Sequence, residues 1–280
     1  MSSTIEAVIF DWAGTTVDHG SIAPVEALRE VFSGSGISLT NEQIRQDMGL
    51  HKREHIKHLL HLPPVSELWQ TRSGRPPSDD DVDVLYQKMI VVQTRVLLRY
   101  SKPIPGVHET AEFLRRRGIK IGSTTGYNLD MMRVVSREAG RHGYVPDCVV
   151  TPDDVAGGRP YPWMIFENAI LLKVIHLSHC VKVGDTISDI EEGKNAGLWT
   201  VGVTRTGNMC GLDEQEWGNL SAAEQSAALA AAEERFRAAG ADYTIPSIAD
   251  LPPVLEKIEK ALESGLIHTL FTERSTAPQI

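Results

Sequence analysis

Short, wholly apolar runs alternate with longer amphipathic segments along most of the chain. Residues 7–10 are four apolar residues without a break, which is typical of a strand buried on both faces of a parallel sheet. Comparable strand-like runs lie at 119–123, 148–150, 179–184, 199–203 and 242–245. Most of the segments between these runs carry apolar residues at helical spacing. The alternation predicts an α/β core, a doubly wound parallel sheet with right-handed crossovers.

The alternation is interrupted between residues 21 and 100, where the pattern predicts helices and no strand. Thr40, with Gln43 three residues later, has the spacing of a capping box at the start of a short helix. A helix from about residue 51 is expected to end at Pro63. Ser78 is expected to cap the last and longest helix of this block.

These patterns predict two domains. Residues 1–20 and 101–265 form a Rossmann-like core domain, and residues 21–100 form an all-α helical cap domain inserted after the first strand. The stretch 204–219 is interpreted as a variable loop, and residues 266–280 are expected to be a poorly ordered tail.

Composition and charge argue against two classes of binding partner, nucleic acids and membranes. The formal net charge of −9, with no basic stripe, argues against nucleic acid. No apolar run is long enough to span a bilayer, and the N-terminus lacks the basic region of a signal peptide, so we expect no membrane partner. The cysteines are widely spaced and show no disulfide or zinc pattern: Cys148, Cys180 and Cys210. The expected location is the reducing cytoplasm.

A carboxylate directly follows the first strand. In open α/β sheets, ligands bind at the carboxyl ends of the strands, which is where Asp11 is expected to lie. The small residues at 13–16 can turn tightly and leave backbone amides beside it to hold an anion. Asp11 is therefore placed like a nucleophile toward phosphorus, which would form an acyl phosphate. The alternative is that Asp11 only caps a following helix.

Further polar residues follow later strands in an order that fits the same chemistry. Thr125 and the amide of Gly126 can hold phosphoryl oxygens, and Arg159 can neutralise their charge. Asp185 and Asp189 lie one helical turn apart and, with Asp11, can supply the oxygen ligands that Mg²⁺ prefers.

Each of these residues also has an ordinary structural explanation. Taken singly, Thr125 can be a turn residue, Arg159 a surface ion pair and Asp185 a helix cap. His51 and His55 have the spacing of two metal ligands on a helix, but no third ligand completes a zinc site. The joint occurrence of the other residues favours phosphoryl transfer.

The occurrence of Asp11, Thr125, Arg159, Asp185 and Asp189 in this order resembles the motifs of the haloacid dehalogenase superfamily of phosphotransferases. Within it, five stretches are similar to the phosphonatase family: 8–18, 48–52, 121–127, 158–164 and 183–186. The resemblance extends from about residue 6 to residue 265 and leaves the stretch 204–219 unassigned. It implies a Mg²⁺ site made by Asp11, the backbone carbonyl of Ala13 and Asp185, with Asp189 in a supporting role.

Ala13 departs from the usual pattern of the superfamily. Most of its phosphatases carry a second Asp two residues after the nucleophile, which protonates the leaving oxygen, whereas Ala13 has only a methyl group. General acid catalysis contributes about 100- to 10,000-fold, so a phosphate-ester hydrolase would be impaired by this change. Cleavage of a P–C bond leaves no oxygen to protonate, and the missing acid is then expected.

Lys52 in the predicted cap is the second departure. By resemblance it is the imine-forming lysine, whose Schiff base with an aldehyde accepts the electrons of the breaking P–C bond. His55, one turn further on, is by resemblance a proton carrier, and Met48 and Tyr127 line the pocket beside it. Without the resemblance, Lys52 reads as a solvated charge, and Met48 and Tyr127 as ordinary packing residues.

The resemblance implies hydrolysis of phosphonoacetaldehyde to acetaldehyde and phosphate, through a Lys52 Schiff base and an Asp11 aspartyl phosphate. It also implies a homodimer formed through the cap. Two rival functions remain open. One is a capped phosphatase or phosphomutase that acts on a phosphate ester, and the other is a non-catalytic, phosphate-binding member of the same fold.

Overall fold

The computed structural model describes residues 3–265, and its centre is a parallel five-stranded sheet in the order β2-β1-β3-β4-β5. The strands are β1 (Ala7–Phe10), β2 (Lys120–Ser123), β3 (Cys180–Gly184), β4 (Trp199–Val203) and β5 (Tyr243–Ile245). In the register of the sheet, Ile9 on β1 lies between Gly122 and Lys182. The predicted α/β fold is confirmed. Strand order reverses at β1, which makes its carboxyl end the favoured place for a ligand.

The expected strand at 148–150 is wrong. Only Val150 forms a bridge, with Thr124, at the outer edge of β2. Just before it, Asp147 donates its backbone N–H to the carbonyl of Ile121 and accepts from the N–H of Ile121 through its carboxylate. A side-chain oxygen thus takes the place of the backbone acceptor that a regular ladder would need.

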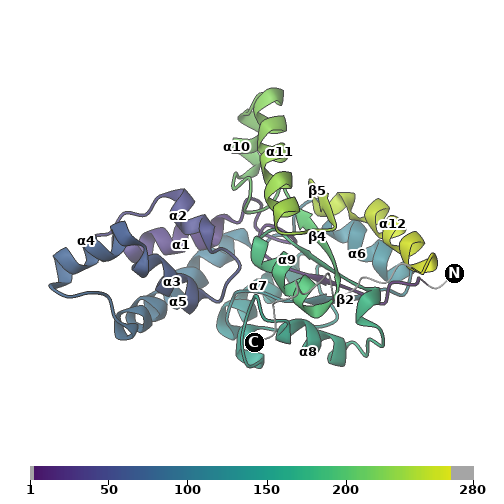
Figure 1. Cartoon of the computed structure of the whole chain (residues 1–280), viewed down its shortest axis with the longest axis horizontal. Helices are drawn as coiled ribbons and strands as arrows, with labels where there is room; N and C mark the ends of the chain where they lie inside the picture. Colours follow the sequence, from purple (N-terminus) through teal and green to yellow (C-terminus); the bar gives the residue numbers. More distant parts are fainter. Residues whose placement is uncertain (1–2, 266–280) are drawn as a thin grey trace, which may run out of the picture.

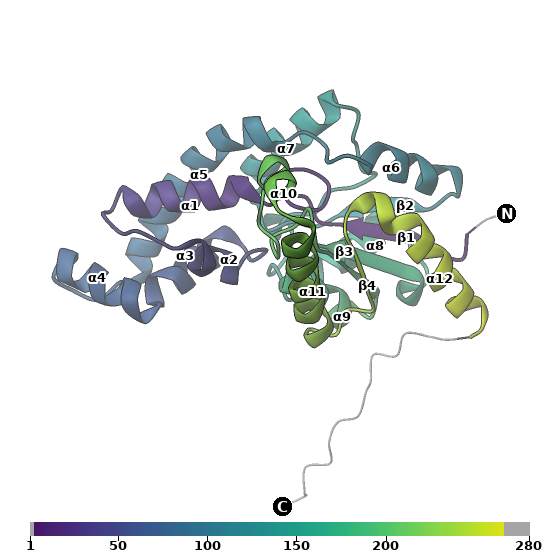
Figure 2. The ribbon, with the colours of Figure 1, turned by 90° about the horizontal axis from the view of Figure 1, so that it is seen from above.

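Helices cover both faces of the sheet (Figure 2). On one face lie α6 (Val107–Arg116), α7 (Leu129–Arg141) and α12 (Leu251–Glu263), and on the other lie α8 (Trp163–Leu171) and α9 (Ile187–Ala196). The strand residues alternate accordingly, since Val8 and Phe10 belong to one buried cluster and Ala7 and Ile9 to the other. The unbroken apolar run of β1 follows from this double burial.

Two further helices, α10 (Glu214–Asn219) and α11 (Ala222–Ala238), project away from the sheet (Figure 1). The expected loop at 204–219 therefore ends in a helix. A capping box marks the start of α10. The Asp213 side chain accepts from the N–H of Glu216, and the Glu216 side chain accepts from the N–H of Asp213. The remaining short elements are 3₁₀ helices at Pro152–Asp154, Leu177–His179 and Ile248–Asp250.

Between β1 and α6 the chain forms five helices and no strand, and the helices lie together on one side of the molecule (Figure 1). They are α1 (Ile22–Ser33), α2 (Asn41–Gln46), α3 (Lys52–His61), α4 (Pro63–Ser73) and α5 (Asp79–Tyr100). Capping boxes at Thr40 and Ser78 confirm the expected starts of α2 and α5. Helix α4 was not predicted, because Pro63 ends α3 but also occupies the first turn of the next helix, where proline is tolerated.

The segment between α2 and α3 brings this helical cap against the carboxyl ends of the strands. Ser188 on α9 donates its hydroxyl to the carbonyl of Met48 at 3.2 Å. A Cβ added to Gly49 would lie 2.3 Å from the Ser188 hydroxyl oxygen, and Gly49 has a φ of +93°, so only glycine fits this contact. The contact places Lys52, the first residue of α3, beside the sheet.

Across residues 3–265, no helix is both long enough and apolar enough to cross a membrane.

Candidate active site

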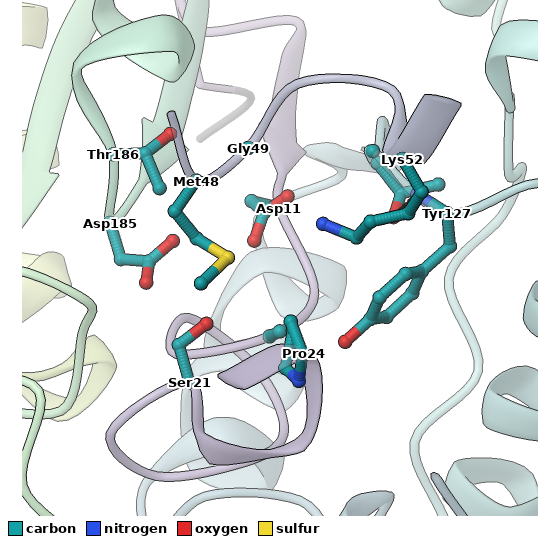
Figure 3. A pocket seen from close by; sticks show the side chains of 12 residues that line it. Asp11, Ser21, Pro24, Met48, Gly49, Lys52, Tyr127, Asp185 and Thr186 are labelled. Atoms are coloured by element: carbon teal, nitrogen blue, oxygen red, sulfur yellow. Dashed lines mark hydrogen bonds between the residues drawn. The ribbon is translucent and has the colours of Figure 1, made fainter. Parts of the chain in front are cut away.

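The carboxyl ends of β1, β2 and β3 and the segment before α3 enclose a small cavity (Figure 3). Most of the residues singled out in the sequence line it: Asp11, Ala13, Met48, Lys52, Thr125, Gly126, Tyr127 and Asp185. Its volume of about 20 Å³ gives room for roughly one water molecule or metal ion. The cap therefore packs closely over this end of the sheet and leaves Lys52 only 2% exposed.

The remaining predicted residues lie outside the cavity wall. Arg159 and Asp189 are buried directly behind Asp11. His55 is fully buried one turn along α3 from Lys52, and its Nε2 lies 2.8 Å from the carbonyl oxygen of Ile44. Because a carbonyl only accepts hydrogen bonds, Nε2 carries the proton and Nδ1 is an acceptor.

Asp11 is held from behind by Arg159. Its Oδ1 lies 2.7 Å from Nη2 of Arg159, and its backbone N–H donates to the carbonyl of Val183 on β3. Burial raises the pKa of Asp11 to about 6, against the opposing effect of the Arg159 charge. The Asp11 carboxylate is thus oriented, poorly hydrated and close to a permanent positive charge.

Arg159 is the hub of a buried charge network. Besides Asp11, its guanidinium contacts Asp189 at 3.0 Å and Glu192 at 2.9 Å, and donates to the hydroxyl of Thr124 at 2.8 Å. Burial alone would lower the pKa of Arg159, but the three carboxylates raise it overall. Arg159 therefore stays charged in a dry environment.

Lys182 and Glu192 belong to the same network and were missed in the sequence. Lys182 Nζ lies 2.8 Å from Asp189, 3.3 Å from Glu192 and 2.8 Å from the Thr124 hydroxyl, and both residues have 0% exposure. The available signal was a lysine in the middle of an otherwise apolar strand. A charge at such a position is buried on both faces and needs partners.

Asp189 is neutralised inside this network. Burial would raise its pKa, but the charges of Arg159 and Lys182 together with hydrogen bonds, including one from Thr186, lower it overall. Asp189 is therefore an anion that holds Arg159 and Lys182 in place.

Asp185 has a different environment. Its Oδ2 accepts from the backbone N–H of Asn208 at 2.7 Å, while its buried Oδ1 has no hydrogen-bond partner within residues 3–265. Burial and the charges of Asp11 and Asp189 raise the pKa of Asp185 well above its usual value. An unsatisfied carboxylate oxygen in a dry site is costly unless a cation occupies the space beside it.

The residues present fit a divalent metal ion. Ligand oxygens of Asp11, Asp185 and Asp189 lie within 4.8 Å of one another. Four carboxylates are buried at the site: Asp11, Asp185, Asp189 and Glu192. The cations Arg159 and Lys182 neutralise only part of this negative charge. A hard divalent cation with carboxylate ligands would restore the balance.

Lys52 is almost completely buried, at 2% exposure, and its Nζ lies 5.3 Å from the centre of the Tyr127 ring. Burial lowers the pKa of Lys52 to about 8, partly opposed by the charge of Asp11. Burial and the Lys52 charge together lower the pKa of His55 to about 3, which keeps the imidazole neutral. A substantial fraction of Lys52 is therefore an uncharged amine near pH 8.

Thr125 and Gly126 form the turn after β2. The Thr125 hydroxyl accepts from the N–H of Tyr127 at 3.0 Å. A Cβ added to Gly126 would lie 2.5 Å from the carbonyl oxygen of Leu50, so a larger residue here would push the cap away. This turn therefore lets the cap close tightly over the cavity.

The proteins that are similar to this chain agree with the geometry of the site. The haloacid dehalogenase-like hydrolase family matches residues 5–197, and a HAD-hydrolase-like family matches residues 156–250. Phosphonoacetaldehyde hydrolase of Bacillus cereus (strain AH820) is 46% identical over 256 residues, which cover 91% of this chain and 97% of that protein. The chain belongs to the phosphonoacetaldehyde hydrolase family of haloacid dehalogenase-like hydrolases.

Other members of the family agree. The phosphonoacetaldehyde hydrolase of Bacillus cytotoxicus is 47% identical over the same shares of both chains. A phosphonoacetaldehyde hydrolase-like protein from Oleispira antarctica has a solved structure with a TM-score of 0.92 and 41% identity, over 95% of this chain and 97% of that one. Membership in this family makes the chain a hydrolase with a Rossmann-like core and a helical cap.

We predict that Lys182→Met lowers the free energy of unfolding by about 3–5 kcal/mol, because it leaves Asp189 and Glu192 buried without one of their cations. Urea unfolding followed by circular dichroism measures the change. Lys120→Met on β2 is the matched control, since Lys120 Nζ donates to the carbonyl of Lys173 at an exposed position. Equal stability of the two variants would show that the buried network does not need Lys182.

Proposed function

We propose that the protein hydrolyses the P–C bond of phosphonoacetaldehyde and releases acetaldehyde and phosphate. One observation carries the proposal: a buried lysine from the cap and a buried aspartate from the core line one small cavity, and no acid stands two residues after that aspartate. Lys52 and Asp11 supply an amine and a carboxylate, and Ala13 fits a reaction without a leaving oxygen. The relatives named phosphonoacetaldehyde hydrolase support this substrate.

The reaction begins at Lys52. Its neutral amine adds to the aldehyde carbon, a proton is taken up and water leaves, which forms a protonated imine. The lowered pKa of Lys52 provides the neutral amine near neutral pH. His55 is proposed as the proton carrier of this step, and Met48 and Tyr127 enclose the aldehyde end of the substrate, since both line the cavity.

Asp11 then attacks phosphorus in line with the P–C bond. As this bond breaks, its electron pair moves into the imine and gives an enamine on Lys52 and an aspartyl phosphate on Asp11. The enamine takes up a proton at carbon and is hydrolysed to acetaldehyde. Water hydrolyses the aspartyl phosphate and restores the Asp11 carboxylate.

The phosphoryl group is proposed to lie between the turns that follow β1 and β2. Thr125 and the Gly126 amide hold its oxygens, and Arg159 holds Asp11 and places a positive charge beside them. Asp11, the backbone carbonyl of Ala13 and Asp185 would hold Mg²⁺, which neutralises phosphoryl charge when bound. Asp189 supports the site by fixing Arg159.

The same proposal assigns residues 21–100 to a cap domain that moves on a core of residues 1–20 and 101–265, in a cytoplasmic homodimer.

An exposed apolar stripe supports dimerisation through the cap. Val84, Val91 and Leu98 lie seven residues apart on α5 and are 56%, 72% and 54% exposed. This spacing keeps them near one face of the helix, as in helices that pack along their length.

We expect sedimentation velocity to give a dimer for the wild type and a monomer for Val91→Glu, because a buried charge at the centre of the stripe opposes association. Glu109→Lys, an exposed position on another helix, α6, serves as a charge-changing control. A monomeric wild type would contradict dimerisation through the cap.

Borohydride trapping tests the imine. With phosphonoacetaldehyde present, reduction is expected to attach the substrate's two-carbon unit to Lys52 and to inactivate the enzyme, as mapped by mass spectrometry of peptides. Lys52→Arg is expected to give no adduct and to lose about 10³-fold or more in kcat, because a guanidinium cannot form the imine. Lys57→Arg, which alters an exposed lysine of the same helix paired with Asp79, is the control and should behave like the wild type.

Continued phosphate release by Lys52→Arg, with no adduct in the wild type, would contradict the imine. It would instead favour a capped phosphatase or phosphomutase that acts on phosphate esters.

The pH profile of kcat/KM tests the state of Lys52 independently. Since the reactive form is the neutral amine and its pKa is about 8, kcat/KM is expected to rise about tenfold per pH unit below pH 8 and to level off above it. A stopped assay of acetaldehyde between pH 6 and 9 measures this limb. A profile that is flat between pH 6 and 8 would show that the ionisation of Lys52 does not control the reaction.

A further inference from the structure

One arginine of the cap reaches two other segments of the protein beside the active site, residues 20–21 and the loop at 204–211. Arg45 lies at the end of α2, and its Nη1 donates to the side-chain Oδ1 of Asn208 at 2.9 Å and to the carbonyl of Gly20 at 3.0 Å. Its Nη2 donates to the carbonyl of Gly211 at 2.9 Å. A Cβ added to Gly211 would lie 2.6 Å from Nε of Arg45, so the loop at 204–211 closely follows the guanidinium.

Asn208 connects this arginine to the carboxylate Asp185. Its side-chain amide donates to the backbone carbonyl of Arg45 at 3.2 Å, in addition to accepting from the guanidinium. Its backbone N–H donates to Oδ2 of Asp185 at 2.7 Å. Asn208 is only 4% exposed, so these three hydrogen bonds are shielded from water. Two successive hydrogen-bonded contacts therefore lead from the cap to Asp185.

Asp185 depends on this loop for its orientation. The Asn208 N–H occupies Oδ2, and Oδ1 remains without a hydrogen-bond partner in the described part of the chain. A Cβ added to Gly207 would lie 2.5 Å from Cβ of Asp185, and one added to Gly14 would lie 2.1 Å from its Oδ2. Thr206 joins these two backbones by donating its hydroxyl to the carbonyl of Gly14 at 3.0 Å. The carboxylate has little freedom as long as the loop stays in place.

We propose that Arg45 and Asn208 are positioning residues of the metal site: Arg45 of the closed cap fixes Asn208, and Asn208 fixes Asp185 so that Oδ1 is left to bind the metal. The proposal rests on the proposed function, which places the metal at Asp185, and adds to it a link between the metal ligand and the cap. Partners that orient a metal ligand commonly change metal affinity 10- to 100-fold when they are removed.

The link acts in both directions. If cap closure orients Asp185, then the closed form binds the metal more tightly, and a bound metal must favour closure by the same factor. The cavity of about 20 Å³ requires the cap to open for substrate entry, which withdraws Arg45 from Asn208. The arrangement therefore assembles the metal site fully only when the cap has closed.

The test is a Mg²⁺ titration of the thermal unfolding midpoint without substrate, in the wild type, Arg45→Met, Asn208→Ala and the double variant. We expect the Mg²⁺ concentration for half of the stabilisation to rise about tenfold in each single variant. The double variant should show no further rise, because both residues act through the same contact. Arg95→Met, which removes an arginine paired with Glu30 within the cap, is the matched control and should match the wild type.

An unchanged half-saturating Mg²⁺ concentration in Arg45→Met and Asn208→Ala would overturn the proposal, even if both variants melt at a lower temperature without Mg²⁺, since that result shows a structural role alone. Rises that add in the double variant would overturn the single path through Asn208. No step of the titration involves phosphonoacetaldehyde. A wild type that releases no acetaldehyde but follows the expected Mg²⁺ pattern would refute only the proposed function.

Discussion

The structure depends on the burial of several carboxylates at one end of a parallel sheet. Asp11, Asp185, Asp189 and Glu192 lie almost out of contact with water, so their charges must be balanced inside the protein. Arg159 and Lys182 balance part of this charge and fix the directions of the side chains that they contact. The remaining negative charge lies beside the cavity, where a divalent cation and a phosphoryl group fit the proposed chemistry. The cost of burial thus produces both the rigid framework and the reactivity of the site.

The cap supplies an amine that the core alone lacks. The core supplies the carboxylates, whereas Lys52 comes from the cap, and its pKa of about 8 results from burial that exists only when the two parts meet. Glycines make this meeting possible, since larger residues at Gly49 or Gly126 would collide with the opposite side. The contact between cap and core therefore brings together the amine of Lys52, the carboxylate of Asp11 and a dry environment.

Features governed by local sequence were predictable. Asp11 and Asp185 were found because an apolar strand delivers each of them to the same edge. Thr40 was found because a capping box has fixed spacing, and Ser78 because it follows a chain break at two prolines. Features that depend on contacts between distant parts of the chain were not predictable from the sequence. Glu192 looks like a surface helix residue until α9 packs on β3, and Arg45 and Asn208 are 163 positions apart. The failed strand at 148–150 has the same cause, because a distant pairing of Asp147 with Ile121 replaced the expected ladder.

The most direct test of P–C bond hydrolysis compares phosphonoacetaldehyde with glycolaldehyde phosphate, which differs by one oxygen between phosphorus and carbon. Each compound is incubated with the purified protein and Mg²⁺, and phosphate and acetaldehyde are quantified together. We expect equimolar acetaldehyde and phosphate from the phosphonate and very slow release from the ester, since Ala13 supplies no acid for a leaving oxygen. Rapid phosphate release from the ester, with no acetaldehyde from the phosphonate, would contradict P–C bond hydrolysis and identify a phosphate-ester hydrolase.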